Sequence, residues 1–367
     1  MTRWLAGMAA GLLACAALPG SAQTPQAPQS IPAFKPDPGW MKLPNGMATG
    51  EISAVAVDGR DHVWVLQRPK TVAEADRAHA APPVLHFGPD GRYIGGFGGP
   101  GAGYDWPTNE HSLAVDAKGR VWIAGSYRAG ADSDDMLLAF TDTGTFIRQI
   151  GRRGGSKGDL DTGNMKAPAD IFVDGSAPDV YVADGYGNRR VIVYDSENGA
   201  FQRMWSAFGK PPPVEPAPAS RTIGAAFTPE TGDGPQGFNG VHGVKVSRDG
   251  LVYVSDRNNQ RIQVFTRDGR YLSQGFVHRN QASPQTASGL AFSADPAQRY
   301  LYVADWGNSE LLVLDRKSLR TLGEIGGKGT APGQFLGPHL IATDSKGNLY
   351  VAEVQGRRLQ RLVPTTR

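Results

Sequence analysis

The fold is decided by one stretch of the chain, His242-Gly-Val-Lys-Val-Ser247 followed closely by Val252-Tyr-Val-Ser-Asp256. The first segment contains two Val residues and the second is rich in Val and Tyr, residues that favour β-strands. Gly250 lies between them and suits a tight turn. A third apolar segment, Ile262-Gln-Val-Phe265, follows a few residues later. The stretch therefore predicts short strands that are connected by turns and lie side by side in one sheet.

The same pattern of two strands and a Gly turn occurs six times along the chain. A four-stranded propeller blade needs roughly 40–45 residues, and each copy has room for one blade. Two β-sandwiches are the alternative, but they would not explain six copies in the same phase. We therefore predict an all-β fold, a six-bladed β-propeller. The first strands of the six copies are Ser53–Asp58, His111–Asp116, Ala169–Asp174, His242–Ser247, Ser288–Ser293 and His339–Asp344.

The propeller is assigned to residues 39–367. Its last repeat stops after a third strand, at Arg357 to Val363. The segment Gly39 to Leu43 precedes the first repeat and could supply the missing fourth strand. That pairing would close the ring and hide its edges.

The N-terminal residues 1–22 read as a signal peptide. Arg3 precedes an apolar stretch, Trp4 to Ala17, that is too short to span a bilayer, and Gly20-Ser21-Ala22 offers a small-residue cleavage site. Residues 23–38 read as a disordered leader. We expect a periplasmic or secreted protein without a transmembrane segment, and the alternative is a lipoprotein anchored at Cys15, the only cysteine.

Composition and charge narrow the range of partners. The chain has 48 Gly and 27 Pro, which suits many short strands and tight turns. Its net charge is only +3, and its Lys and Arg residues are scattered, so we expect no nucleic-acid partner. A small-molecule or peptide substrate and a monomeric protein are the expectation.

Three of the seven histidines occupy one repeat position in alternate repeats. The first residue of the first strand is small in three repeats and is His111, His242 or His339 in the other three. First strands line the channel of a propeller, and alternate blades of six are about 120° apart. The three imidazoles are therefore predicted to converge on the axis as a divalent metal site, with zinc preferred and a fourth position open. The other histidines, His62, His79, His86 and His278, share no such register and are expected to be surface or loop residues.

A second register follows the second strand. Arg68 and Arg257 occupy this slot in the first and fourth repeats, and Tyr186 lies one residue beyond it in the third. These turns and the histidine ends of the first strands should lie on the same face of the ring. Arg68, Tyr186 and Arg257 are therefore expected above the metal.

At this point the residues resemble a known family. The strand pairs look like NHL repeats, and the whole constellation resembles peptidyl-α-hydroxyglycine α-amidating lyase, the lyase half of the peptide-amidating enzymes. The telling stretches are Phe238–Phe265, Val180–Arg189, Leu336–His339 and Leu66–Arg68. NHL repeats alone are a weak signal, because many are simple binding scaffolds. The added histidines, arginines and tyrosine make the resemblance specific.

The resemblance implies an activity and a role for each residue. His111, His242 and His339 would bind zinc, and Tyr186 would act as general base at the substrate hydroxyl. Arg68 and Arg257 would lower the pKa of the tyrosine and hold the substrate carboxylate. The reaction would split R-CO-NH-CH(OH)-COO⁻ into an amide and glyoxylate, and a related small α-hydroxy compound is also open as the substrate.

One departure puts a structural calcium ion of the family in doubt. The acidic residue expected after the last zinc-binding histidine is replaced here by Leu340. Two other functions remain open: a non-enzymatic NHL-repeat binding module, and a calcium-dependent hydrolase of the lactonase kind. The lactonase interpretation is disfavoured, because its channel would need Glu, Asp and Asn ligands where this chain has His and small residues.

Overall fold

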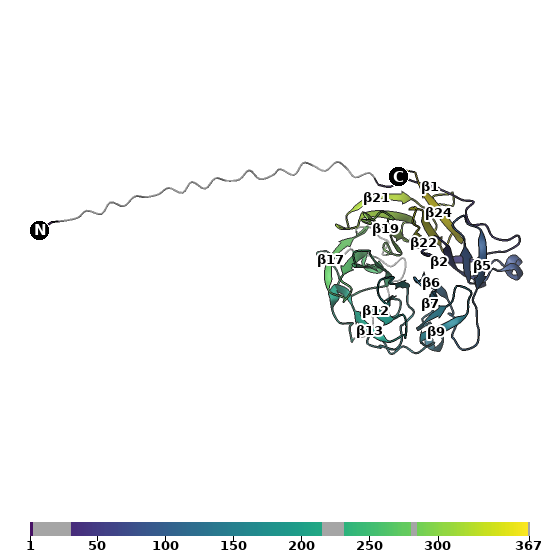
Figure 1. The fold of residues 1–367 in the computed structure, drawn as a ribbon, viewed down its shortest axis with the longest axis horizontal. Coiled ribbons are helices and arrows are strands. Elements are labelled where there is room, and N and C mark those ends of the chain that lie inside the picture. The colour runs from purple at the N-terminus through teal and green to yellow at the C-terminus, as the bar shows by residue number, and fades with distance from the viewer. Residues whose placement is uncertain (3–30, 215–230, 280–284, 366–367) are drawn as a thin grey trace. The chain divides into compact units, whose positions relative to one another are not determined.

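The computed structural model describes residues 1–2, 31–214, 231–279 and 285–365, and the predicted signal peptide therefore lies outside the described residues except at its first two. Residues 31–367 form one compact unit built from six four-stranded sheets. This arrangement confirms the predicted six-bladed β-propeller (Figure 1). The helical segments are short 3-10 turns: η1 (Pro69–Thr71), η2 (Glu74–His79), η3 (Gly130–Asp132), η4 (Ala207–Gly209) and η5 (Arg257–Asn259).

Each blade is an antiparallel sheet whose strands follow one another from the innermost outward. Blade 1 has β2 (Glu51–Val57), β3 (Val63–Arg68), β4 (Val84–Phe87) and β5 (Tyr93–Phe97); blade 2 has β6 (Glu110–Val115), β7 (Val121–Gly125), β8 (Met136–Phe140) and β9 (Phe146–Gly151); blade 3 has β10 (Asp170–Val173), β11 (Asp179–Asp184), β12 (Arg190–Asp195) and β13 (Phe201–Trp205). Blade 4 has β14 (Val241–Val246), β15 (Val252–Asp256), β16 (Arg261–Phe265) and β17 (Tyr271–Phe276); blade 5 has β18 (Leu290–Phe292), β19 (Tyr300–Asp305), β20 (Glu310–Asp315) and β21 (Thr321–Gly326); blade 6 has β22 (Pro338–Thr343), β23 (Leu349–Glu353), β24 (Arg358–Pro364) and β1 (Phe34–Pro36).

The first strands of the blades form the inner wall of the ring. Each contacts the first strand of the next blade, in the order β2, β6, β10, β14, β18, β22 and back to β2. Between the blades, an aromatic residue from each second strand packs against the sheet of the following blade, as Trp64 does against Leu113 and Ile123 of blade 2. Since neighbouring blades cover both faces of each blade, the inner strands consist largely of consecutive apolar residues. The six aromatic residues are Trp64, Trp122, Tyr181, Tyr253, Tyr302 and Tyr350.

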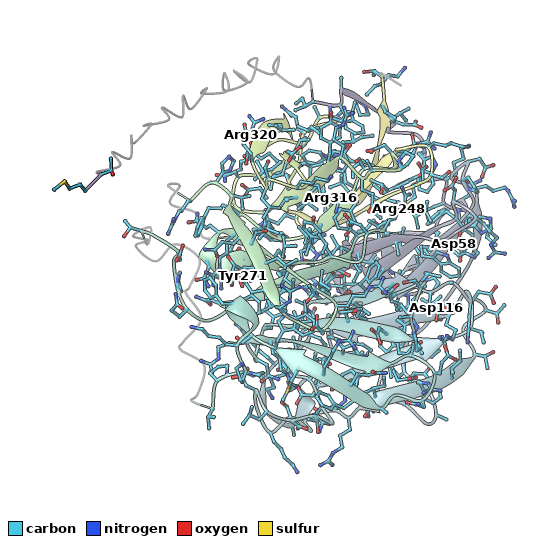
Figure 2. The ribbon with its side chains drawn as sticks, turned by 60° about the vertical axis from the view of Figure 1, so that its left-hand side comes forward. Asp58, Asp116, Arg248, Tyr271, Arg316 and Arg320 are labelled. Atoms are coloured by element: carbon cyan, nitrogen blue, oxygen red, sulfur yellow. The ribbon has the colours of Figure 1, made fainter. Side chains whose placement is uncertain are left out.

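Each predicted first strand ends in an Asp or Ser residue, and this residue stabilises the turn that follows the strand. Asp58 and Asp116, labelled in Figure 2, accept hydrogen bonds from the indole nitrogens of Trp64 and Trp122 at 3.3 and 3.2 Å. Arg316 of blade 5, also labelled, binds both carboxylate oxygens of Asp249 in a turn of blade 4 at 2.8 and 2.9 Å. These contacts fix the ends of the strands within and between blades.

The ring closes with a different segment from the one predicted. β1 pairs with β24, with Phe34 opposite Pro364 and Lys35 opposite Val363, whereas Gly39 to Leu43 forms no such strand. Trp40 instead fills the space between blades 6 and 1, with its ring 5.1 Å from Tyr350 and 5.8 Å from Phe87. The predicted segment thus packs between two blades and does not pair with β24. The leader assignment of residues 23–38 is therefore wrong for residues 34–36, which belong to the propeller.

One of the four histidines expected to be surface or loop residues, His86, is instead buried in a strand. His86 of β4 stacks on Trp64 at 3.7 Å and lies 2.9 Å from His62. Burial, and then the neighbouring His62, lower the pKa of His86 to about 4.

Among the described residues, no helix has both the length and the apolar character needed to cross a bilayer.

His278 replaces an arginine that other blades use. At the end of the second strand a buried carboxylate pairs with an arginine of the third strand, as in Asp184–Arg190 and Asp256–Arg261, both at 2.8 Å. Blade 5 has Asp305 in the acidic position but Glu310 in place of the arginine. His278 supplies the cation instead. Its ring nitrogens lie 2.8 Å from Asp305, 3.3 Å from Glu310 and 3.1 Å from Glu324.

The cluster around His278 predicts a pH-dependent stability. The hydrogen bond that His278 donates to Asp305, together with the nearby carboxylates of Glu324 and Glu310, raises the pKa of His278 to about 9. Because the folded pKa lies above the unfolded value of about 6.5, this stabilisation is complete below about pH 6.5 and is lost as pH rises toward 9. We expect the melting temperature of the protein to fall by a few degrees more over this interval than that of His278→Gln. An exposed control, His79→Gln, should follow the wild type, and equal slopes for all three proteins would contradict the assignment.

Candidate functional site

The three register histidines meet at the axis of the ring. His111 lies in β6, His242 in β14 and His339 in β22. Their ring centroids are 4.6 to 5.4 Å apart, and one nitrogen from each lies within 4.8 Å of the other two. The structure thus brings together the three residues that the repeat register selected. Nitrogens at this spacing can share one ion with modest adjustment, since zinc–nitrogen bonds are about 2.0–2.1 Å long.

The intervening small residues orient two of the imidazoles. His111 donates from Nδ1 to the carbonyl oxygen of Ala169 at 2.8 Å, and His339 donates from Nδ1 to that of Ser53 at 2.6 Å. Ala169 and Ser53 occupy the register position in the blades between the histidines. A proton fixed on Nδ1 leaves Nε2 with its lone pair, and such carbonyl partners are common behind metal-binding histidines.

All three imidazoles are kept neutral. Burial is the largest cause, and it lowers the pKa of His111 and His242 well below the ordinary value and that of His339 to about 3. The positive charges of Arg68 and Arg257 act in the same direction on His111 and His339. Neutral imidazole is the form that binds metals. The donor set therefore fits a divalent ion of the zinc type.

Tyr186 lies directly above the histidines. It follows β11, and its hydroxyl oxygen is 2.9 Å from Nε2 of His111 and 3.0 Å from Nε2 of His242. Arg257 donates from Nη1 to the same hydroxyl at 3.3 Å and lies over the ring, with its guanidinium carbon 5.3 Å from the centroid. The Tyr186 hydroxyl thus lies within hydrogen-bonding distance of two imidazoles and one guanidinium.

Arg68 reaches the same cavity but has other partners. It ends β3, donates from Nε to the carbonyl oxygen of Glu110 at 2.8 Å, and pairs through Nη1 with Glu51 at 2.7 Å. Its contacts therefore fix the residue that precedes His111. Of the two arginines expected beside the tyrosine, the hydrogen bond to the Tyr186 hydroxyl comes from Arg257.

The site opens into a cavity of about 570 Å³. Trp306 forms part of its wall, edge-on to His339 with ring centroids 5.7 Å apart. It occupies the same slot as Arg68 and Arg257, so the register could have identified it. Ser126 occupies this slot in the second repeat and Asn258 lies one residue beyond it in the fourth, so the register could have identified both. Four further lining residues lie outside these two registers and were missed: Asn109, Arg128, Asn239 and Gln285.

Below the histidines, the channel holds an internal ion pair. Asp170 lies one residue after Ala169 in β10 and is almost fully buried. It accepts hydrogen bonds from Ser112 Oγ and from the backbone nitrogen of Val244, both at 3.1 Å, and it contacts the ammonium of Lys245. Leu340, at the equivalent position in blade 6, packs in the apolar cluster between blades 1 and 2.

Comparison with known proteins agrees with this architecture. A model of the NHL repeat matches residues 238–265. NHL repeat-containing protein 3 of Homo sapiens is 28% identical over 340 residues, covering 90% of this chain and 84% of that protein. Peptidyl-alpha-hydroxyglycine alpha-amidating lyase 1 of Drosophila melanogaster is 24% identical over 285 residues, covering 71% of this chain and 46% of that protein. A solved streptogramin B lyase has 12% identity, a TM-score of 0.51 and coverage of 90% of this chain and 98% of its own, which shows the fold alone.

These findings define the class of protein. The chain is a six-bladed β-propeller in which residues 238–265 match the NHL repeat. It resembles both NHL repeat-containing protein 3 and the peptidyl-α-hydroxyglycine α-amidating lyases. The repeat scaffold alone is compatible with both a binding module and an enzyme, and the residues of the central cavity distinguish the two.

Proposed function

We propose that the protein is an exported, zinc-dependent lyase that cleaves an α-hydroxyglycine-type carbinolamide to an amide and glyoxylate. The observation that carries this proposal is the position of the Tyr186 hydroxyl, which contacts two converging histidines and the Arg257 guanidinium. A tyrosine needs nearby positive charge to accept a proton at neutral pH, since its reference pKa is about 10. Export depends on residues 1–22, and lipidation at Cys15 remains the alternative route.

The chain's own residues account for binding and proton transfer. Arg257 holds the substrate carboxylate and stabilises negative charge on the Tyr186 oxygen. Zinc held by His111, His242 and His339 would polarise the substrate hydroxyl. Tyr186 takes the proton of that hydroxyl, the C–O bond becomes the carbonyl of glyoxylate, and the C–N bond breaks with its electron pair on nitrogen. The nitrogen then gains the proton, so the amide and glyoxylate together contain all atoms of the substrate and no water is consumed.

Metal analysis and product analysis of the same preparation test the proposal. The purified protein should contain about one zinc per chain. It should release glyoxylate and an equal amount of amide from an α-hydroxyglycine peptide. A protein with zinc but no glyoxylate release would favour the second candidate, an NHL-repeat binding module, which the extensive similarity to NHL repeat-containing protein 3 also supports. A protein that purifies and acts without metal would contradict the zinc proposal.

We also propose that Lys245 takes the place of a channel calcium ion. The carboxylate at this height comes from Asp170, and its charge is already matched by the Lys245 ammonium. A calcium ion would have to compete with this ammonium for Asp170, and Leu340 offers no oxygen. The described residues around Asp170 therefore do not fit a calcium site well.

This arrangement predicts how the protein responds to calcium removal. We expect EGTA to leave the melting temperature of the wild type unchanged. Lys245→Met should be destabilised by about 3–5 kcal/mol, because it leaves the buried Asp170 charge unpaired, and millimolar calcium should recover part of that loss. Lys118→Met removes an exposed ammonium that pairs with Glu197 and is the matched control. A wild-type melting temperature that falls in EGTA would contradict the proposal.

A further inference from the structure

The cavity above the histidines carries more positive charge than the proposed chemistry uses. Four arginines line it, and none of its described lining residues is Asp or Glu. Two of these arginines are neutralised from outside the cavity: Arg68 pairs with Glu51 at 2.7 Å, and Arg189 pairs with Asp159 at 2.8 Å. The remaining two, Arg128 and Arg257, have no carboxylate within 4.0 Å among the described residues.

These two arginines contact opposite ends of one residue. Arg257 donates to the Tyr186 hydroxyl at 3.3 Å, whereas Arg128 donates from Nη1 to the Tyr186 backbone carbonyl oxygen at 3.4 Å. Arg257 is only 9% exposed and lies deep beside the histidines, but Arg128 is exposed at the mouth of the cavity. The two guanidinium groups thus contact Tyr186 at different atoms, one at the hydroxyl and one at the backbone carbonyl.

The wall near Arg128 is built for polar groups. Ser126 and Asn109 line the same side of the cavity, and Asn109 donates from Nδ2 to Ser126 Oγ at 2.8 Å. Arg128 follows them on the loop after β7 and supplies the only unneutralised charge among the lining residues of that wall that the structure describes. Its backbone-carbonyl contact uses one of five N–H donors, so the others can bind an anion.

We propose that the substrate carries a second anionic group and that Arg128 is the residue that recognises it. This inference depends on the proposed function: the α-hydroxy carboxylate would bind beside Arg257, and the amide side would present a second carboxylate toward the cavity mouth. An acidic residue directly before the hydroxyglycine places a carboxylate there. Arg128 acts as a specificity-determining residue, and Tyr186 separates the two anion positions.

Two matched substrates test the inference, N-acetyl-Glu-α-hydroxyglycine and N-acetyl-Gln-α-hydroxyglycine. They differ by one charge at nearly constant shape. Wild type should show a kcat/KM for the Glu substrate that is about threefold to fivefold higher, the upper part of the range expected for an exposed charge pair. The preference should shrink as salt is raised from 0.01 to 0.5 M, since screening weakens exposed pairs.

Variants separate recognition from a general effect. Arg128→Gln should make the two substrates equal within about twofold, and Arg128→Glu should reverse the order. Arg77→Gln removes an exposed arginine outside the cavity and should keep the wild-type ratio. Equal kcat/KM values for both substrates in the wild type would overturn the inference and leave the lyase proposal intact. Absence of glyoxylate from both substrates would instead overturn the lyase proposal, and this inference with it.

Discussion

A His242→Ala variant is expected to lose its bound zinc and to release glyoxylate at least about 10³-fold more slowly than the wild type. The reason is geometric. His242 is one of three imidazoles whose nitrogens lie within 4.8 Å of one another, and the methyl group of alanine cannot reach the shared position. Two histidines would remain, too few for a stable three-nitrogen site. Inductively coupled plasma mass spectrometry and a glyoxylate assay on the same sample give the measurement.

A matched histidine variant tests whether the loss of any histidine would have the same effect. His79→Ala removes an exposed imidazole from η2 and should retain full zinc and activity. Circular dichroism should show that His242→Ala keeps its β-structure, because the surrounding strand β14 is held by its ladder with β15. Wild-type zinc content in folded His242→Ala would show that the three imidazoles do not hold the metal.

Tyr186→Phe is expected to lower kcat by about 10²–10⁴ while zinc content stays at the wild-type level. The substitution removes only the hydroxyl that contacts His111, His242 and Arg257. The ring and its contact with the Arg257 guanidinium remain, so substrate binding should change less than turnover. This separates a general base from a residue that merely shapes the cavity.

The control for this variant is Tyr271→Phe. Tyr271, labelled in Figure 2, lies in the outer strand β17 of blade 4, packed on Phe208 with ring centroids 5.1 Å apart. Loss of its hydroxyl should leave kcat unchanged. If Tyr186→Phe retained kcat, or if it lost zinc together with activity, Tyr186 would hold the metal or shape the cavity without accepting the substrate proton.

Repeat register explains why the centre of the site could be predicted from sequence. A blade repeats its backbone, so equal positions in different blades have equal heights and equal distances from the axis. His111, His242 and His339 share one such position, and the chain needs no other information to bring them together. Trp306 obeys the same rule at the second slot, although its role as a wall of the cavity was not recognised.

Features that depend on side-chain competition could not be read from the pattern. The closing strand is Phe34–Pro36, and the predicted segment instead places Trp40 between Tyr350 and Phe87. Arg68 was expected to lower the pKa of Tyr186. Instead, it forms an ion pair with Glu51, which lies opposite it in the neighbouring strand β2. His278 shares no repeat position with another histidine. It lies beside Glu310, which occupies the position in blade 5 where other blades have an arginine. Arg128 lies on a loop outside the repeat.

The pairing of β1 with β24, which closes the ring, also limits how much of the N-terminal segment can be removed. β1 and β22 belong to the same sheet, so the blade that carries His339 is completed by residues from the other end of the chain. Removal of the N-terminal segment up to residue 33 leaves this sheet whole. Trimming only a few residues further would remove β1, the outer strand of the sheet whose inner strand carries His339. Any proteolytic removal of the N-terminal segment would therefore have to stop before Phe34 to keep this sheet complete.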